Sequence, residues 1–205
     1  MQEQLDALLC TRYPAIFSAG GSAGRHLFGF ECGDGWFTLI DGACELIQRH
    51  IETDGTQRQL LALQVKEKFG GLRFYYRHGS GYAAAVVELA ETLSPHVCEV
   101  CGALGKVVSL FGWMQTRCPT HERTTVCEEA LLSKVRDNLV LAPPMGELLG
   151  AALEFFALDG QAAARWLTQP APALGHIIPL ALAGSEDGQR QVLTLIGRLE
   201  YGITP

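Results

Sequence analysis

Four side chains of the kinds that bind zinc stand as two pairs in the middle of this 205-residue chain. Cys98 and Cys101 form a C-x2-C pair, Cys118 and His121 form a C-x2-H pair, and sixteen residues separate the two pairs. Each spacing lets both side chains reach one ion, and tetrahedral zinc takes four such sulfur and nitrogen ligands. Because the protein supplies all four, no position stays open for water, and the sequence predicts a structural zinc ion.

Other chemistries can be built from the same residue types. Cys98 and Cys101 alone are also the spacing of a redox pair, but the second pair at matching spacing favours a metal. A similar zinc fold also carries nucleases of the His-Asn-His type, which need a catalytic histidine near the hairpin. Here His121 is assigned to the metal and His96 precedes the first pair, so we predict no enzyme. Cys127 is an alternative ligand at a less suitable spacing.

The overall composition limits the class of protein. Seven cysteines, an odd number, favour metal binding or buried thiols over a disulfide framework, and we expect Cys10, Cys32 and Cys44 to pack as small apolar groups. The chain has no apolar run of about 18 residues, and its polar, acidic first residues do not resemble a secretory signal. We therefore expect a cytoplasmic protein without a membrane segment. A net charge of −6 argues against broad nucleic-acid binding but leaves a local basic patch open.

The segments around the four ligands predict how they are positioned. Residues 106–110 and 113–117 flank Phe111 and Gly112, which is the pattern of a short β-hairpin. A helical stretch from Glu128 to Val135 follows the second pair. The tight turn that carries the first cysteine pair (the knuckle, residues 98–101) is thus followed by a hairpin and then by a helix. This order of elements is similar to that of a treble-clef zinc fold.

The N-terminal part alternates between helical and strand patterns. Apolar residues from Phe37 to Ile51 recur at three- and four-residue steps, which predicts an amphipathic helix that follows the glycine-rich turn 31–36 and ends at Asp54 and Gly55. Alternating apolar residues in 61–65 and 72–76 predict two antiparallel strands joined near residues 68–71. A further helix, 82–93, ends directly before the first cysteine pair.

One cluster of basic residues stands out in this part. Lys66, Lys68, Arg73 and Arg77 surround Tyr75 and Tyr76. Such a set either follows a phosphate backbone while its aromatic rings stack on bases, or is the solvated face of a hairpin. The Gly33–Gly35 turn is too short to indicate a phosphate loop.

The C-terminal part predicts helices alone. Apolar residues from Met145 to Phe156 mark one helical face, and a second short helix, 162–167, is stopped by Pro170 and Pro172. Ser185 is a typical start for the last helix, whose inward stripe runs from Val192 to Leu199. Pro143 and Pro144 are the natural boundary between the parts. The predicted fold is α+β: a zinc-stabilised α+β module over 1–140, then a small all-α domain over 145–205.

This C-terminal part resembles the toxin-binding domain of Xre/MbcA/ParS-type antitoxins from about Met145 onward. The resemblance lies in Trp166-Leu167 at a helix end, the proline-rich turn through Ala173-Leu174-Gly175, Pro179-Leu180, and the ending Arg198-Leu199-Glu200-Tyr201-Gly202. The sequence departs from the family at Ala171, where the family has Asn, at His176 in place of a small residue, and at Leu199 in place of Ile.

The resemblance implies a function. In this family the final helix and tail of the antitoxin block the active site of a partner toxin, and the implied partner is a RES-type toxin that consumes NAD. The family positions that would contact the toxin are Arg198, Glu200, Tyr201 and Gly202, while Trp166 and Leu174 would hold the scaffold. After Gly202 only residues 203–205 follow, so we expect the tail to be free to insert.

A second resemblance covers roughly residues 13 to 121. The segments 31–36 and 64–74 and the zinc motif look like a family of small, uncharacterised zinc-containing proteins of phages and bacteria, which brings no known activity. Antitoxins of the resembled family usually carry a helix-turn-helix, and this organisation does not match one. We predict a non-enzymatic, two-part antitoxin. The alternative is a zinc-containing regulator of phage origin that binds nucleic acid and is dimerised by its C-terminal part.

Overall fold

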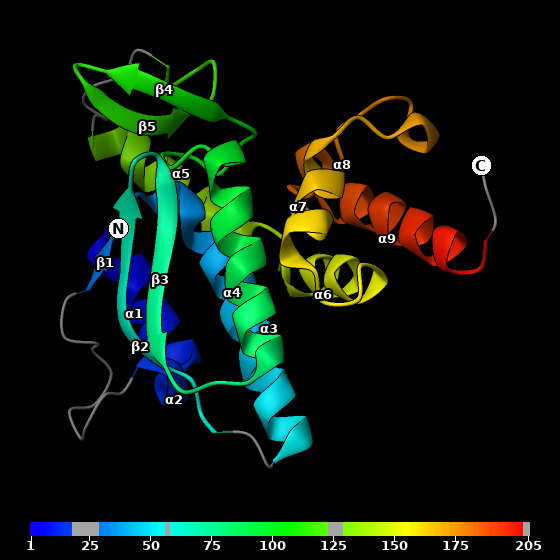
Figure 1. Cartoon of the computed structure of the whole chain (residues 1–205). Coiled ribbons are helices and arrows are strands. Elements are labelled where there is room, and N and C mark those ends of the chain that lie inside the picture. The colour runs from blue at the N-terminus through cyan, green and yellow to red at the C-terminus, as the bar shows by residue number, and fades with distance from the viewer. Residues whose placement is uncertain (18–28, 56–57, 123–128, 203–205) are drawn as a thin grey trace.

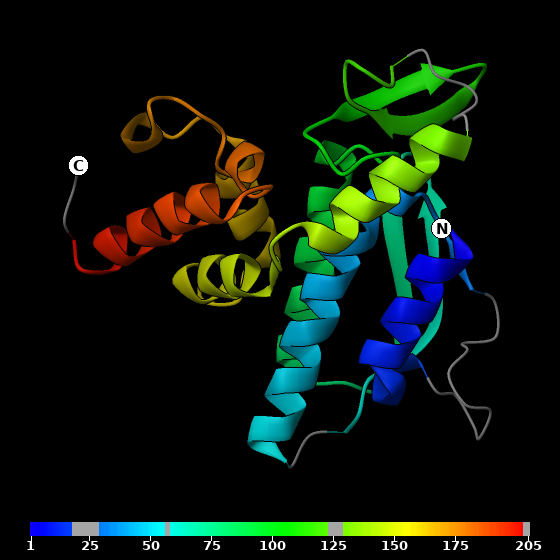
Figure 2. The same cartoon turned by 180° about the vertical axis from the view of Figure 1, so that it is seen from behind.

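The structure is a computed structural model, and it describes residues 1–17, 29–55, 58–122 and 129–202. It combines helices with two small sheets (Figure 1). The helices after residue 145 stand to one side of the sheets in both views (Figures 1 and 2). The predicted mixture of helix and strand is therefore confirmed.

A three-stranded sheet, in the order β1-β2-β3, forms the first layer. Strand β1 (Phe30–Glu31) pairs parallel to β2 (Leu61–Lys68), which pairs antiparallel to β3 (Gly71–Arg77). The two longer strands were predicted, whereas β1, α1 (Glu3–Arg12) and α2 (Pro14–Phe17) were not. Val65 and Phe74 face each other across the strands and are buried. Helices lie behind the sheet, and its other face is turned to the viewer in Figure 1.

Two long helices form the next layer. Helix α3 (Phe37–Asp54) ends at Gly55, whose φ of +58° closes the helix with a left-handed residue. Helix α4 (Gly81–Leu93) begins at Ser80, whose side chain accepts a hydrogen bond from the Ala83 amide at 3.1 Å. Both helices match the predicted ones. Side chains at the end of α4 also protect the edge strand β3, because Glu91 and Ser94 each accept a hydrogen bond from one of its amides at 2.7 Å.

A two-stranded sheet follows, formed by β4 (Lys106–Leu110) and β5 (Trp113–Arg117), which confirms the predicted hairpin. Helix α5 (Glu129–Leu141) comes next. The prediction that this helix begins at Glu128 falls outside the described residues.

The C-terminal part consists of α6 (Gly146–Phe155), α7 (Gly160–Thr168), the short 3-10 helix η3 (Pro172–Leu174), α8 (Pro179–Leu182) and α9 (Glu186–Glu200). Asp159 caps α7 by accepting from the Ala162 amide at 2.8 Å, and Ser185 caps α9 by accepting from the Gly188 amide at 3.2 Å. The three predicted helices and the serine cap are confirmed.

The two parts pack against each other through close backbone contacts. Helix α6 packs on α3 and α7 packs on α4, and buried residues of both parts belong to one hydrophobic core. A Cβ added to Gly42 would lie 3.0 Å from the amide nitrogen of Gly146, and one on Gly160 would lie 2.9 Å from the carbonyl oxygen of Ala85. The boundary at Pro143 and Pro144 stays a prediction. In the described part of the chain, no helix is both long and apolar enough to cross a bilayer.

Candidate functional site

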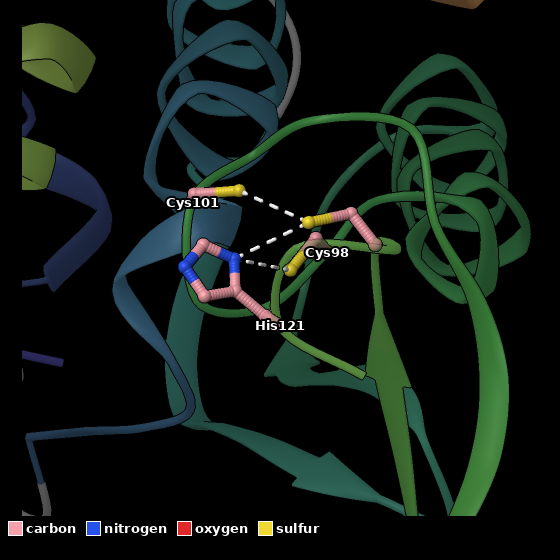
Figure 3. Close-up of side chains that lie close together, drawn as sticks. Cys98, Cys101 and His121 are labelled. Atoms are coloured by element: carbon pink, nitrogen blue, oxygen red, sulfur yellow. Dashed lines mark hydrogen bonds between the residues drawn. The ribbon is translucent and has the colours of Figure 1, made fainter. Parts of the chain in front are cut away.

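The two predicted ligand pairs meet in space. The sulfur atoms of Cys98, Cys101 and Cys118 and a ring nitrogen of His121 all lie within 4.8 Å of one another. The Nδ1 atom of His121 is 3.2 Å from the Cys118 sulfur and 3.7 Å from that of Cys98, and the sulfurs of Cys101 and Cys118 are 3.7 Å apart. Figure 3 shows the labelled side chains pointing toward one another.

These distances fit a tetrahedral metal. Zinc bonds of about 2.3 Å to sulfur and about 2.1 Å to nitrogen place neighbouring ligands of a tetrahedron about 3.6 to 3.8 Å apart. The two separations of 3.7 Å lie in this range and the separation of 3.2 Å is shorter, so the arrangement is close to that of a tetrahedral site. The donor set of three thiols and one imidazole is also one that zinc prefers.

Backbone turns hold the ligands in place. The Gly102 amide donates to the Cys98 carbonyl at 2.8 Å, and the His121 amide donates to the Cys118 carbonyl at 2.9 Å, so each pair spans a tight turn. Gly102 has a φ of +79°, a conformation that suits glycine. Cys98, Cys118 and His121 are buried and Cys101 is half-buried. The site is therefore closed rather than open to solvent.

The polar contacts inside the cluster change the acidity of its thiols. The pKa of Cys98 is lowered to about 4, chiefly because the Cys101 thiol donates a hydrogen bond to it, with help from backbone amides against the effect of burial. The same hydrogen bond raises the pKa of Cys101. A thiolate at Cys98 is the form that binds metal.

The glycine-rich turn before α3 fixes this cluster to the main core. A Cβ on Gly35 would lie 2.0 Å from the carbonyl oxygen of Cys98, and one on Gly33 would lie 2.0 Å from that of Glu99. The Gly35 amide donates to the Glu99 carbonyl at 2.9 Å, and the Trp36 ring nitrogen donates to the Val97 carbonyl at 2.8 Å. The turn allows the backbone of the knuckle to approach closely, a role that sequence reasoning missed.

A buried ion pair lies directly beside the first ligand. The Arg117 guanidinium donates to the Glu99 carboxylate, and both side chains are almost fully buried. Burial raises the pKa of Glu99 even though Arg117 opposes it. The pair links β5 to the knuckle, and removing one partner would leave the other charge buried without compensation.

The three cysteines predicted to pack as apolar groups, Cys10, Cys32 and Cys44, are buried, as expected. Burial raises the pKa of Cys32 to about 12 and that of Cys44 well above its ordinary value, which keeps both thiols neutral. Cys127, the alternative ligand, lies outside the described residues.

The predicted contact residues lie at the end of α9. Arg198 and Glu200 are exposed on the last turn, and the side chain of Tyr201 is 83% exposed. Gly202 is also exposed and adopts a φ of +67°, the left-handed conformation that commonly follows the end of a helix. The Tyr201 ring is thus mostly presented to solvent rather than packed in the core.

A groove of about 470 Å³ runs along α9, from Asp187 to Arg198, between this helix and the turn that contains η3. Leu174 and Arg198 both line it, so the structure brings these two predicted residues together. Glu200, Tyr201 and Gly202 are not among its lining residues. The groove is further lined by residues that sequence reasoning missed: Ala173, Asp187, Arg190, Gln191, Thr194 and Leu195.

A recognisable signal marks some of the missed residues. Arg190, Thr194 and Arg198 recur at four-residue steps, which places them on one polar face of α9, away from the buried stripe of Val192 and Ile196. Arg190 also forms an exposed ion pair with Asp187 at 3.0 Å.

Trp166 does not reach the groove. It is half-buried, packs against the core, and lies 6.3 Å from the ring of Phe156. The turn that follows is held by the Ala171 amide, which donates to the Ile177 carbonyl at 3.1 Å. His176 has a φ of +62°, which explains why a small residue suits that position.

Comparison with known proteins identifies the same region. Residues 151–202 match the sequence model described as the antitoxin Xre/MbcA/ParS C-terminal toxin-binding domain. An antitoxin Xre of Photorhabdus laumondii is 38% identical over 52 residues, 25% of this chain and 35% of the relative. An antitoxin Xre of Yersinia enterocolitica is 39% identical over 56 residues, 27% of this chain and 38% of the relative.

The aligned region therefore spans little more than a third of each relative. These matches support the antitoxin resemblance for the C-terminal part, whereas neither aligned stretch is long enough to include the whole N-terminal module. No solved structure matches the chain at a significant level.

Proposed function

We propose that this chain is an antitoxin whose C-terminal helices bind and neutralise a cognate toxin of the RES type, which consumes NAD. The observation that carries the proposal is the match of residues 151–202 to an antitoxin toxin-binding domain. The exposed end of α9 falls at the last residues of this match. The role is non-enzymatic, and we expect it to be exerted in the cytoplasm.

The contact in this proposal is made by the end of α9. Tyr201 is the anchor, because a large aromatic side chain that is exposed when free and buried when bound contributes most to binding at protein interfaces. Arg198 and Glu200 flank it with opposite charges, and Gly202 permits close backbone approach. Trp166 supports the domain from the core, and Leu174 forms the wall of the groove opposite Arg198.

The metal in this proposal is a structural zinc ion held by Cys98, Cys101, Cys118 and His121 in a treble-clef-like module. The support is the separation of the four ligand atoms and the closed surroundings of the site. The ion would join the knuckle to the end of β5, two segments that are otherwise linked mainly by the Glu99–Arg117 pair and backbone hydrogen bonds.

The test of the toxin proposal is co-expression with a neighbouring reading frame that encodes a RES-type protein. The full chain should rescue growth, and a chain without residues 201–205 should not, while the two melt at similar temperatures. The variant Tyr201→Phe serves as the matched control, because it keeps the ring, and it should still rescue.

Rescue by a folded truncated chain would reject the tail as the inhibitory element. If the full chain neither rescues growth nor co-purifies with the candidate toxin, the assignment of that toxin class is wrong.

A further inference from the structure

Two hairpin turns of the N-terminal part have the same unusual composition. Phe69 and Gly70 connect β2 to β3, and Phe111 and Gly112 connect β4 to β5. All four residues have positive φ, between 52° and 83°. Two-residue turns with positive φ at both positions strongly favour Asn-Gly, because a bulky side chain is strained in the left-handed region. A phenylalanine at the first position therefore costs stability in both turns.

Packing in the core does not offset this backbone strain. The side chains of Phe69 and Phe111 are 74% and 85% exposed, and Trp113, directly after the second turn, is 73% exposed. Strained residues that add nothing to the core point to a functional role. Both turns lie at the same end of the molecule, the upper end in Figures 1 and 2. Their hairpins adjoin, since the Thr116 hydroxyl donates to the Gly70 carbonyl at 2.5 Å, a contact at the end of the β4–β5 hairpin opposite its turn.

Basic residues continue from the first turn onto the open face of the three-stranded sheet. Arg73, Tyr75 and Arg77 alternate with inward residues such as the buried Phe74, and Lys66 pairs opposite Arg73. This face is not covered by a helix (Figure 1). The basic and aromatic residues noted in the sequence between Lys66 and Arg77 therefore lie on this face. Tyr76 is the exception, because it packs against the core.

The cations on this face form no salt bridge within the described residues, although Glu31, which pairs with Lys66 in register, lies on the same face. None of the ion pairs in the described part of the chain includes Lys66, Lys68, Arg73 or Arg77. Instead, the Lys66 ammonium lies 5.3 Å from the centre of the Tyr75 ring, and the Lys68 ammonium lies 5.5 Å from that of Phe69. In a chain with a net charge of −6, the lysines over exposed rings give this face a local combination of positive charge and aromatic surface.

We propose that this hairpin surface binds a single-stranded nucleic acid. The surface is defined by Lys66, Lys68, Phe69, Tyr75, Phe111 and Trp113. In this arrangement the exposed rings stack on bases and the lysines neutralise phosphates, the combination by which proteins hold single strands without reading their sequence. A duplex is a poorer ligand, because its bases are already stacked. The proposal is independent of the toxin contact at the end of α9.

The test uses the purified full chain loaded with zinc and fluorescently labelled oligothymidine and oligouridine of about 15 nucleotides, with a duplex of the same length for comparison. We expect binding to at least one single strand, weaker binding to the duplex, and a loss of affinity as salt is raised. Stronger binding of oligothymidine would identify the ligand as DNA. Stronger binding of oligouridine would identify it as RNA.

The decisive variants are Phe69→Asn and Phe111→Asn. Asparagine suits both turns better than phenylalanine, so each variant should melt at the same or a higher temperature while its affinity falls by about fivefold to 150-fold, the effect of losing one stacked ring. Leu158→Asn is the matched control. Leu158 is also an exposed apolar residue with positive φ (+68°), but it lies between α6 and α7, and its replacement should leave affinity unchanged.

Three results would overturn the proposal. The first is that the wild-type chain binds neither single strand at low salt. The second is that the two asparagine variants bind as tightly as wild type. The third is that the wild-type chain binds no oligonucleotide while the asparagine variants lose toxin neutralisation, which would make the hairpin surface a protein contact.

Discussion

The Cys/His cluster and the end of α9 are both marked by short sequence motifs, but their side chains point in opposite directions, inward in the cluster and outward at the helix end. The side chains of the cluster turn inward and lie within 4.8 Å of one another, three of them buried. The side chains at the end of α9 turn outward, with Tyr201 83% exposed. Residues that contact one another in a closed site contribute to the stability of the fold. Residues left exposed at the end of a helix are available to bind a partner.

The largest effect on stability is expected from losing a metal ligand. Structural zinc contributes on the order of 10–16 kcal/mol of apparent binding free energy in small modules, so Cys98→Ser should lose the metal and the cooperative unfolding of the N-terminal part. Elemental analysis should find one zinc per wild-type chain. Cys32→Ala, which changes a buried thiol outside the cluster, should keep that zinc. An unchanged zinc content and melting curve in Cys98→Ser would contradict the metal assignment.

A smaller but still severe effect is expected at the turn that approaches the knuckle. In Gly35→Ala the added methyl group would meet the Cys98 carbonyl oxygen at 2.0 Å, which neither backbone can accommodate without moving. We expect a loss of about 3 kcal/mol in the free energy of unfolding, and weaker zinc retention during dialysis against a chelator. A Gly35→Ala variant that melts like wild type would show that the knuckle is not held by this turn.

A moderate effect is expected at the contact between the two parts. In Gly160→Ala the new methyl group would press on the Ala85 carbonyl and the Leu89 amide of α4, at 2.9 Å from each, and destabilise the chain by about 1–3 kcal/mol.

A fragment of residues 145–205 is the companion experiment. It should be helical by circular dichroism, but it should melt below the full chain because its α6–α7 face has lost α3 and α4. An unstructured fragment would reject the domain boundary at Pro143 and Pro144.

The smallest effect has the opposite sign. Gly197 lies inside α9, and a Cβ at this position would meet no atom within 4 Å. Gly197→Ala should therefore raise the free energy of unfolding by about 0.5–1 kcal/mol, because alanine favours helix more than glycine does. A destabilised Gly197→Ala variant would mean that the last turns of α9 are held differently from the arrangement described above.

Sequence patterns predicted the elements whose signals are local. The stripe from Phe37 to Ile51, the β4–β5 hairpin and the Ser185 cap each depend on neighbours a few residues away, and each was predicted. The sequence also predicted that Cys98, Cys101, Cys118 and His121 come together, because the spacing of the two pairs is itself the requirement for binding one ion.

The parts that were missed depend on distant contacts. Gly35 shows only a turn in the sequence, because its close partner Cys98 is remote in the chain. Strand β1 has only two residues and exists through its pairing with β2, and α1 has no amphipathic pattern strong enough to indicate it. The groove on α9 depends on η3 lying against it, which no local pattern indicates.

The central claim, that the exposed end of α9 is the toxin contact, is tested most directly by one affinity. The dissociation constant between the zinc-loaded chain and the neighbouring toxin candidate should be measured by calorimetry for wild type, Tyr201→Phe and Tyr201→Ala. We predict that Tyr201→Ala weakens binding by about 30-fold or more, the effect of losing an anchor worth about 2 kcal/mol, with zinc content and melting temperature unchanged. Equal affinities for wild type and a fully folded Tyr201→Ala would contradict the account.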